Sequence, residues 1–217
     1  MTKSRIKSQK HLRMRAKTLL KNQKLGFSEE YFRELRGVLD KLDYKQMEKM
    51  VNVIWKAYKS DKTIFFMGNG GSASTATHLA ADIGKNTVIV NSNSKRRFKT
   101  VALTDNVAWM TALGNDLSYE DIFVEQLKNF VKKGDVVVGI SGSGNSMNVV
   151  KAIEYANEVG ATTAGLLGFS GGKMLKIVDV PVLVPVDHYG YVEGVHSEIH
   201  HYLVEALKIL KKNENLH

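Results

Sequence analysis

Two strand-like runs in this chain each lead directly into a loop of glycine, serine and asparagine, and a helix-compatible stretch follows each loop. The loops read Gly68-Asn69-Gly70-Gly71-Ser72 and Ser141-Gly142-Ser143-Gly144-Asn145-Ser146. Glycines let backbone amides converge on a ligand, serine hydroxyls add donors, and a helix N-terminus adds partial positive charge. Two such loops on one sheet predict a phosphorylated ligand. Tight turns and serine caps are the competing explanation, and it is weaker for the second loop, whose three serines exceed capping needs.

Around these loops, strand-like and helix-like patterns alternate. The strand-like runs are 63–67, 87–90, 100–104, 135–140, 162–167 and 181–184, and the helical stretches are 72–83, 107–113, 119–132, 146–159 and 190–211. Such alternation predicts a three-layer α/β/α fold around a mostly parallel sheet. Both loops then lie at carboxyl ends of strands, where sheets of this kind bind their ligands.

An N-terminal helical segment precedes this alternation. From Ser28 to about Lys59, apolar residues recur at helical spacing, which predicts one long helix or two helices joined near Asp43 and Tyr44. The apolar face of residues 29–59 is broader than one small sheet can cover, so we expect it to pack between subunits.

The net charge of +9 is concentrated at the N-terminus. Nine of the 31 lysines and arginines precede Glu29, the first acidic residue, and the other 22 are balanced by 22 acids. We therefore divide the chain into a basic extension, residues 1–28, and one domain, residues 29–217. The extension suits nucleic acid or an acidic partner, but a solvated tail without a partner is the favoured interpretation.

Composition excludes several kinds of chemistry. Without cysteine there is no disulfide, no thiolate catalysis and no cysteine-based zinc site, so any metal must bind through histidine and carboxylate. The first loop lacks the third glycine of a dinucleotide fingerprint, and no Walker lysine is present, which argues against a nucleotide cofactor. No apolar run is typical of a membrane span or secretory signal, so we expect a cytoplasmic protein.

Histidines and carboxylates gather in two places. His78 and Asp82 share one face of the predicted helix 72–83. A denser group near the C-terminus contains Asp187, His188, Glu193, His196, Glu198, His200 and His201. Such groups indicate divalent metal binding or proton transfer, the alternative being a polar helix face at an oligomer interface. In an ideal helix His200 lies about 20° from Glu193 and His201 about 80° away, so helix geometry favours His200.

Taken together, the motifs resemble the sugar isomerase (SIS) domain family and, within it, the phosphoheptose isomerases, which convert sedoheptulose 7-phosphate to a heptose 7-phosphate. They appear in family order over about residues 29–210 and include both loops, His78-Leu79-Ala80-Ala81-Asp82, Leu103-Thr104-Asp105, Gly114-Asn115-Asp116, Gly171-Gly172-Lys173-Met174 and Glu193 through His201. The resemblance implies a SIS domain with an about five-stranded, flavodoxin-like sheet.

The resemblance also implies roles for individual residues. It assigns the phosphate to Ser72, Ser141, Gly142, Ser143 and Ser146, the sugar hydroxyls to Asn69, Asp105 and Asn115, and zinc or another divalent metal to His78, Asp82, Glu193 and His201. Family enzymes carry glutamate and glutamine where this chain has Asp82 and Glu193. In family enzymes the second histidine ligand stands eight residues after the glutamine, and that position here is His201. Helix geometry instead favours His200, and a curved helix would reconcile the two.

The implied function is a phosphosugar aldose–ketose isomerase that works through an enediolate with metal assistance. Asp82 or Glu193 would be the base, with Asp82 preferred, and His201 would move protons between the two oxygens. The resemblance further implies a homotetramer. The alternative is a non-catalytic SIS-domain regulator that binds a sugar phosphate or a protein partner, in which Asp82, Glu193 and His201 would have no combined use.

Overall fold

The computed structural model describes residues 26–89 and 96–214. Contacts divide the chain into one unit of residues 1–40 and another of residues 41–217. In the described part of the first unit, Gly26–Leu39 form helix α2. The predictions for the basic extension before Gly26 fall outside the described residues.

Residues 28–59 form two helices rather than one, the second of the two possibilities that the sequence allowed. The second helix, α3, spans Tyr44–Lys59 and belongs to the larger unit. Asp43 starts it, because its Oδ1 accepts hydrogen bonds from the backbone amides of Lys45 at 2.9 Å and Gln46 at 3.3 Å. A side chain that satisfies these otherwise unpaired amides is a helix N-cap, and it separates α3 from α2.

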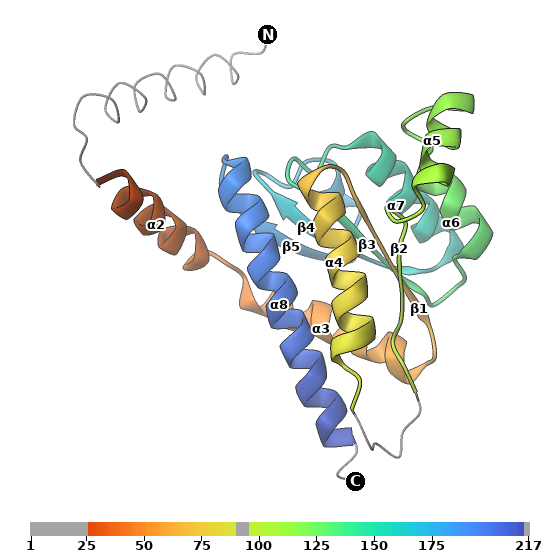
Figure 1. The fold of residues 1–217 in the computed structure, drawn as a ribbon, viewed down its shortest axis with the longest axis horizontal. Helices are drawn as coiled ribbons and strands as arrows, with labels where there is room; N and C mark the ends of the chain where they lie inside the picture. Colours follow the sequence, from red (N-terminus) through yellow and green to blue (C-terminus); the bar gives the residue numbers. More distant parts are fainter. Residues whose placement is uncertain (1–25, 90–95, 215–217) are drawn as a thin grey trace. The chain divides into compact units, whose positions relative to one another are not determined.

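The larger unit is built on a five-stranded, fully parallel sheet, which confirms the predicted fold class (Figure 1). The strands are β1 (Thr63–Gly68), β2 (Lys99–Ala102), β3 (Val136–Ser141), β4 (Thr162–Gly168) and β5 (Val180–Val184), in the order β2-β1-β3-β4-β5. Between them and after them come α4 (Gly71–Asn86), α5 (Val107–Asp116), α6 (Val124–Phe130), α7 (Met147–Val159), the short 3-10 helix η1 (Met174–Lys176) and α8 (Tyr189–Glu214).

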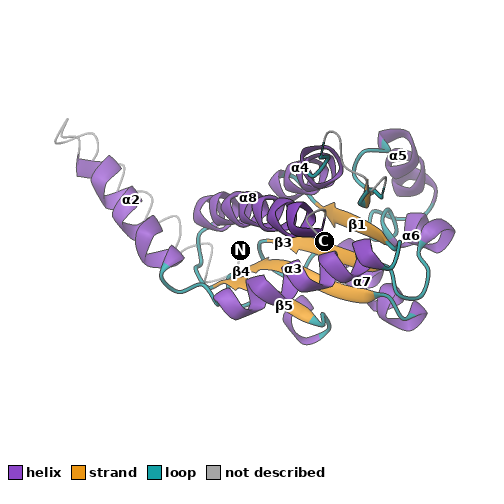
Figure 2. Ribbon diagram, turned by 90° about the horizontal axis from the view of Figure 1, so that it is seen from below, coloured by secondary structure: helices purple, strands orange, loops and turns teal. Residues whose placement is uncertain are grey.

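Helices cover both faces of the sheet because successive strand side chains point to opposite sides. Phe65 and Met67 of β1 belong to the core beneath α6 and α7, together with Leu127 and Ile153. On the other face, α3, α4 and α8 pack on the strands, and α4 and α8 lie side by side (Figure 2).

The strand order places a topological switch point between β1 and β3. After β1 the chain moves outward to β2 and then returns to add β3 on the other side of β1. The two strands end at the same edge, with Gly68 opposite Ile140. Loops diverge at such a point and leave a crevice for a ligand. Both glycine-rich loops open into this crevice.

Two predicted elements differ from the structure. The strand-like run 87–90 is not a strand over its described residues 87–89, because Thr87 follows the last turn of α4 and its hydroxyl donates to the carbonyl of Ile83 at 2.6 Å. The helix expected over 119–132 is shorter, since turns occupy residues 119–123 before α6. Among the described helices, none has the length and apolarity needed to cross a membrane.

Candidate active site

The serine loop between β3 and α7 contains a hydroxyl at the start of a helix that is not used for capping. Ser146 occupies the N-cap position of α7, yet its side chain makes no capping hydrogen bond. Its Oγ lies 3.2 Å from Oγ of the buried Ser141, which also accepts a bond from the amide of Gly144 at 3.1 Å. Helix capping therefore does not explain Ser146, and its role in ligand binding stays a prediction.

Close backbone packing fixes the shape of this loop. Gly144 has φ +63°, and a Cβ placed on it would lie 1.9 Å from the carbonyl oxygen of Gly171. The amide of Met174 donates to the Gly144 carbonyl at 3.0 Å, and the amide of Lys173 donates to the side chain of Asn145 at 3.0 Å. The Gly171-Gly172-Lys173-Met174 motif therefore supports the serine loop from behind.

A pocket of about 170 Å³ opens at the switch point between the two loops. Its lining residues are Asn69, Ser72, Ile140, Ser141, Gly142, Ser143, Ser146, Tyr189 and Glu193. The pocket therefore gathers all five residues predicted for the phosphate, together with Asn69 and Glu193. Several hydroxyls around so small a volume suit a phosphate group, which carries three or more acceptor oxygens.

Glu193 brings a carboxylate to the N-terminal end of α4. A Cβ placed on Gly71 would lie 2.6 Å from Oε2 of Glu193, so only glycine leaves room for the carboxylate there. The partial positive charge of a helix N-terminus favours a carboxylate at this position. The N-terminus of α8, where Glu193 lies, thus packs against the first glycine loop.

Two aromatic side chains that no sequence motif predicts lie at one side of the pocket. Tyr189, the first residue of α8, lines the pocket, and its ring contacts that of Phe169 edge-on with centroids 4.7 Å apart. Phe169 follows β4 with φ +54°, a left-handed conformation that bulky residues rarely adopt. No pattern in the sequence signals this conformation, because it depends on tertiary packing.

A second group of polar side chains lies farther along α4 and α8. Oδ2 of Asp82 is 3.3 Å from Nε2 of His78 and 3.0 Å from Nε2 of His200. One ligand atom from each of these three residues lies within 4.8 Å of the others. Two imidazoles and one carboxylate at this spacing are a donor set that a divalent cation can use.

His200 is the buried member of this histidine cluster. Burial lowers the pKa of His200 to about 4, and the neighbouring His78 and His201 lower it further against the opposing effect of Asp82. Its Nδ1 is buried without a hydrogen-bond partner among the described residues. His200 is therefore neutral near pH 7, which is the form of imidazole that binds metal.

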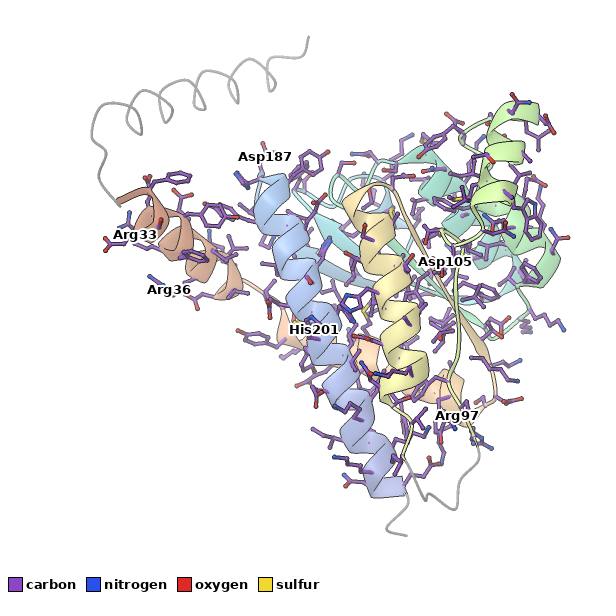
Figure 3. The ribbon with its side chains drawn as sticks, viewed as in Figure 1. Arg33, Arg36, Arg97, Asp105, Asp187 and His201 are labelled. Atoms are coloured by element: carbon purple, nitrogen blue, oxygen red, sulfur yellow. The ribbon has the colours of Figure 1, made fainter. Side chains whose placement is uncertain are left out.

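His201 and Glu193 lie outside this three-residue group. The ring centroid of His201 is 5.6 Å from that of His78 and 4.4 Å from that of His200, on which it stacks. His201 is exposed on α8 beside α4 (Figure 3). The structure thus brings together His78, Asp82 and His200, whereas metal ligation by Glu193 and His201 stays a prediction.

His196 lies on α8 between Glu193 of the serine pocket and His200 of the histidine cluster, and it connects α8 to the sheet. Its Nε2 is 3.1 Å from the carbonyl oxygen of Leu167 near the end of β4, and its side chain is buried. Burial lowers the pKa of His196 to about 4, although the bond to Leu167 opposes the shift. The ring is therefore neutral and donates to Leu167, which makes His196 a support of the site rather than one of its ligands.

Asp105 and Asn115, the other predicted sugar contacts, do not line the serine pocket. Asp105 accepts a hydrogen bond from the hydroxyl of Thr77, and Asn115 on α5 donates to Asp116 at 2.8 Å. Asp105 lies just beyond the end of β2 (Figure 3). Their contact with a sugar stays a prediction.

Fold and site together define a sugar isomerase domain. The profile of the SIS domain family matches residues 30–168, well over half of the chain, and the protein belongs to this family. Within it, the chain belongs to the phosphoheptose isomerase family, as comparison with individual proteins shows. The phosphoheptose isomerase of Syntrophotalea carbinolica is 35% identical over 181 residues, which cover 82% of this chain and 90% of that protein. That of Geotalea daltonii is 42% identical over 160 residues, covering 73% and 81%.

Solved structures agree with this placement. The phosphoheptose isomerase of Neisseria gonorrhoeae superimposes with a TM-score of 0.75 at 29% identity, covering 84% of this chain and 97% of that one. The enzyme from Francisella tularensis gives a TM-score of 0.76 at 23% identity, which supports the shared fold.

Proposed function

We propose that the protein is an aldose–ketose isomerase that converts sedoheptulose 7-phosphate to a heptose 7-phosphate. The observation that carries the proposal is the serine pocket, which is lined by four serines, among them Ser146 whose hydroxyl caps no helix, and by the carboxylate of Glu193. Phosphoheptose isomerases of similar sequence over most of their length support this choice of substrate. A phosphate bound by the serines would anchor one end of the sugar.

The length of the site supports a long sugar. Gly71, which contacts Glu193, and His78 are seven residues apart on α4, a separation of about 10 Å along the helix. A seven-carbon chain has six carbon–carbon bonds of about 1.5 Å, so with its phosphate ester it reaches from the serines toward the histidine cluster. A triose phosphate is too short to occupy both ends at once.

Asp82 is the better candidate for the base. It lies in the histidine cluster, where the length of the sugar places C1 and C2 once the serines hold the phosphate, whereas Glu193 lines the serine pocket at the other end. In the proposed reaction Asp82 takes a proton from C1 of the ketose and delivers it to C2. The exposed imidazole of His201 carries the hydroxyl proton from O1 to O2, so that no oxidant or reductant is needed.

The histidine cluster fits a divalent cation, with zinc as the expected ion. His78, Asp82 and His200 would hold it, because one ligand atom from each of them lies within 4.8 Å of the others. When bound, the cation would stabilise the negative charge that develops on the sugar oxygens. Within the protein, Asp82 holds the two imidazoles in a fixed orientation.

A homotetramer is the proposed assembly. Helix α5 has no buried residue, and the described chain exposes large apolar side chains on and beside it at Val107, Leu117, Tyr119 and Phe130. Association of subunits would remove such a surface from water. Light scattering at micromolar concentration checks this, and a monomer would contradict it. The cytoplasmic location expected from the sequence likewise stays a prediction.

The direct test mixes purified protein with sedoheptulose 7-phosphate in D2O and follows carbon-bound deuterium by NMR. An isomerase exchanges the C1 proton with solvent while it forms the aldose. Binding of the sugar phosphate without exchange or product would instead identify a non-catalytic regulator.

A further inference from the structure

Two asparagines join the loops of the proposed active site through a reciprocal pair of hydrogen bonds. Nδ2 of Asn69 donates to Oδ1 of Asn148 at 2.9 Å, and Nδ2 of Asn148 donates to Oδ1 of Asn69 at 2.9 Å. Asn69 lies in the first glycine loop, and Asn148 is the second residue of α7, directly after the serine loop. The two residues are 79 positions apart in the sequence.

The pairing uses most of the hydrogen-bonding capacity of Asn69. An amide oxygen has two lone pairs, and those of Asn69 are taken by Asn148 and by the hydroxyl of Tyr119 at 2.9 Å. Of its two N–H groups, one is used by Asn148. Asn69 therefore has a single N–H left for a ligand, although the resemblance assigns its side chain to the sugar hydroxyls.

Asn148 is buried away from the pocket, so it can affect a ligand only through the residues that it contacts. Its side chain is 2% exposed, and its Oδ1 also accepts the amide of Val149 at 2.9 Å. It does not line the serine pocket. An amide buried in this way is held in one orientation, because rotation would leave its polar atoms without partners and without water.

We propose that Asn148 is a positioning residue that clamps the first glycine loop to the serine loop and so fixes the spacing between Ser72 and the other phosphate-binding serines. The carbonyl of Asn69 accepts the amide of Ser72 at 3.0 Å, so the clamp also sets where α4 begins. A bound phosphate needs hydroxyls from both loops at once, and a misplacement of about 1 Å can cost about 10²-fold in rate.

Hydrogen–deuterium exchange of the ligand-free protein tests the clamp without reference to activity. In Asn148→Ala we expect the amides of residues 69–73 and 142–146 to exchange about tenfold faster, as loss of a buried hydrogen-bonded pair predicts. The matched control is Asn157→Ala at the other end of α7, where Asn157 also makes two side-chain bonds, to Ile177 and Thr163. Unchanged exchange in Asn148→Ala, or equal acceleration of these amides in Asn157→Ala, would overturn the clamp.

A second measurement separates positioning from stability, and it rests on the proposed function. Calorimetric titration with inorganic phosphate should show binding at least about tenfold weaker for Asn148→Ala and Asn148→Asp than for Asn157→Ala. The aspartate variant keeps the acceptor but faces the Asn69 oxygen with a second oxygen, so wild-type affinity in Asn148→Asp would overturn the clamp. If the wild-type protein neither binds phosphate nor converts the substrate, the proposed function is wrong. The exchange experiment would still test whether Asn148 holds the two loops together.

Discussion

The two ends of the proposed active site are built in opposite ways. At the phosphate end, backbone contacts such as that between Gly144 and the Gly171 carbonyl hold the loop, and the serine hydroxyls face an open pocket. At the histidine end, side chains from α4 and α8 alone form the group of His78, Asp82 and His200. The proposed phosphate end therefore depends on backbone packing between loops, whereas the histidine end depends on how two helices pack together.

The largest expected effect concerns the proposed base. Asp82→Asn should lower kcat by about 10²- to 10⁴-fold, since proton abstraction is lost, while phosphate affinity stays close to wild type. Steady-state kinetics and metal analysis check this, with Glu198→Gln on the exposed surface of α8 as the control. Near wild-type kcat in Asp82→Asn would move the role of base to Glu193.

The free energy of unfolding should decrease at acidic pH because His196, which lies between the two ends of the site, is buried in its neutral form. The folded-state pKa of His196 is lowered to about 4, below the ordinary value of about 6.5. Between these pH values the unfolded state therefore binds a proton at this residue and the folded state does not. Stability should therefore fall as pH decreases from 6.5 to 4, by up to about 3 kcal/mol for this residue, with no contribution above pH 6.5.

His196→Gln isolates this contribution, because glutamine can still donate to the Leu167 carbonyl but does not titrate. Denaturant unfolding at several pH values should show a shallower loss of stability in the variant. An identical pH dependence in the two proteins would mean that His196 is not the group responsible.

The histidine end offers a choice between two neighbouring imidazoles. Because His200 belongs to the group with His78 and Asp82, His200→Asn should lose about 10- to 100-fold in metal affinity. His201→Asn should keep its metal and lose activity through slower proton transfer. Metal titration of both variants decides between them, and metal loss in His201→Asn alone would favour the family alignment over the observed geometry.

The smallest effect is expected at the phosphate end, where several donors share the ligand. Ser143→Ala should weaken phosphate binding by about 1 kcal/mol, or roughly fivefold, as expected for one lost hydrogen bond to a charged group. Calorimetry with inorganic phosphate measures this, and Ser74→Ala, on the exposed side of α4, is the control. Equal affinities for the two variants would remove Ser143 from the phosphate site.

Local patterns predicted most of the fold and the grouping of the serine-loop residues around one pocket. Strand-like runs followed by glycine loops indicated a parallel sheet, and the serines after β3 lie in the expected pocket because both loops follow neighbouring strands. The strand predicted over 87–90 was wrong because that prediction also used local pattern alone. Its β-branched residues are typical of a strand, but the Thr87 hydroxyl donates to the carbonyl of Ile83 in α4. Short apolar runs carry little information about which partner they will find.

By itself, the sequence determined the α/β class, the two loops of glycine and serine that follow strands, and the histidine–carboxylate residues from which a metal site can be built, because these depend on residue type and on spacing within one element. Only the tertiary structure decided that His200 joins His78 and Asp82, that Phe169 holds Tyr189 at the pocket, and that Asn148 pairs with Asn69. Each of these contacts links side chains from separate elements. Their geometry depends on how helices and loops pack on the sheet, which the spacing within a single element does not specify.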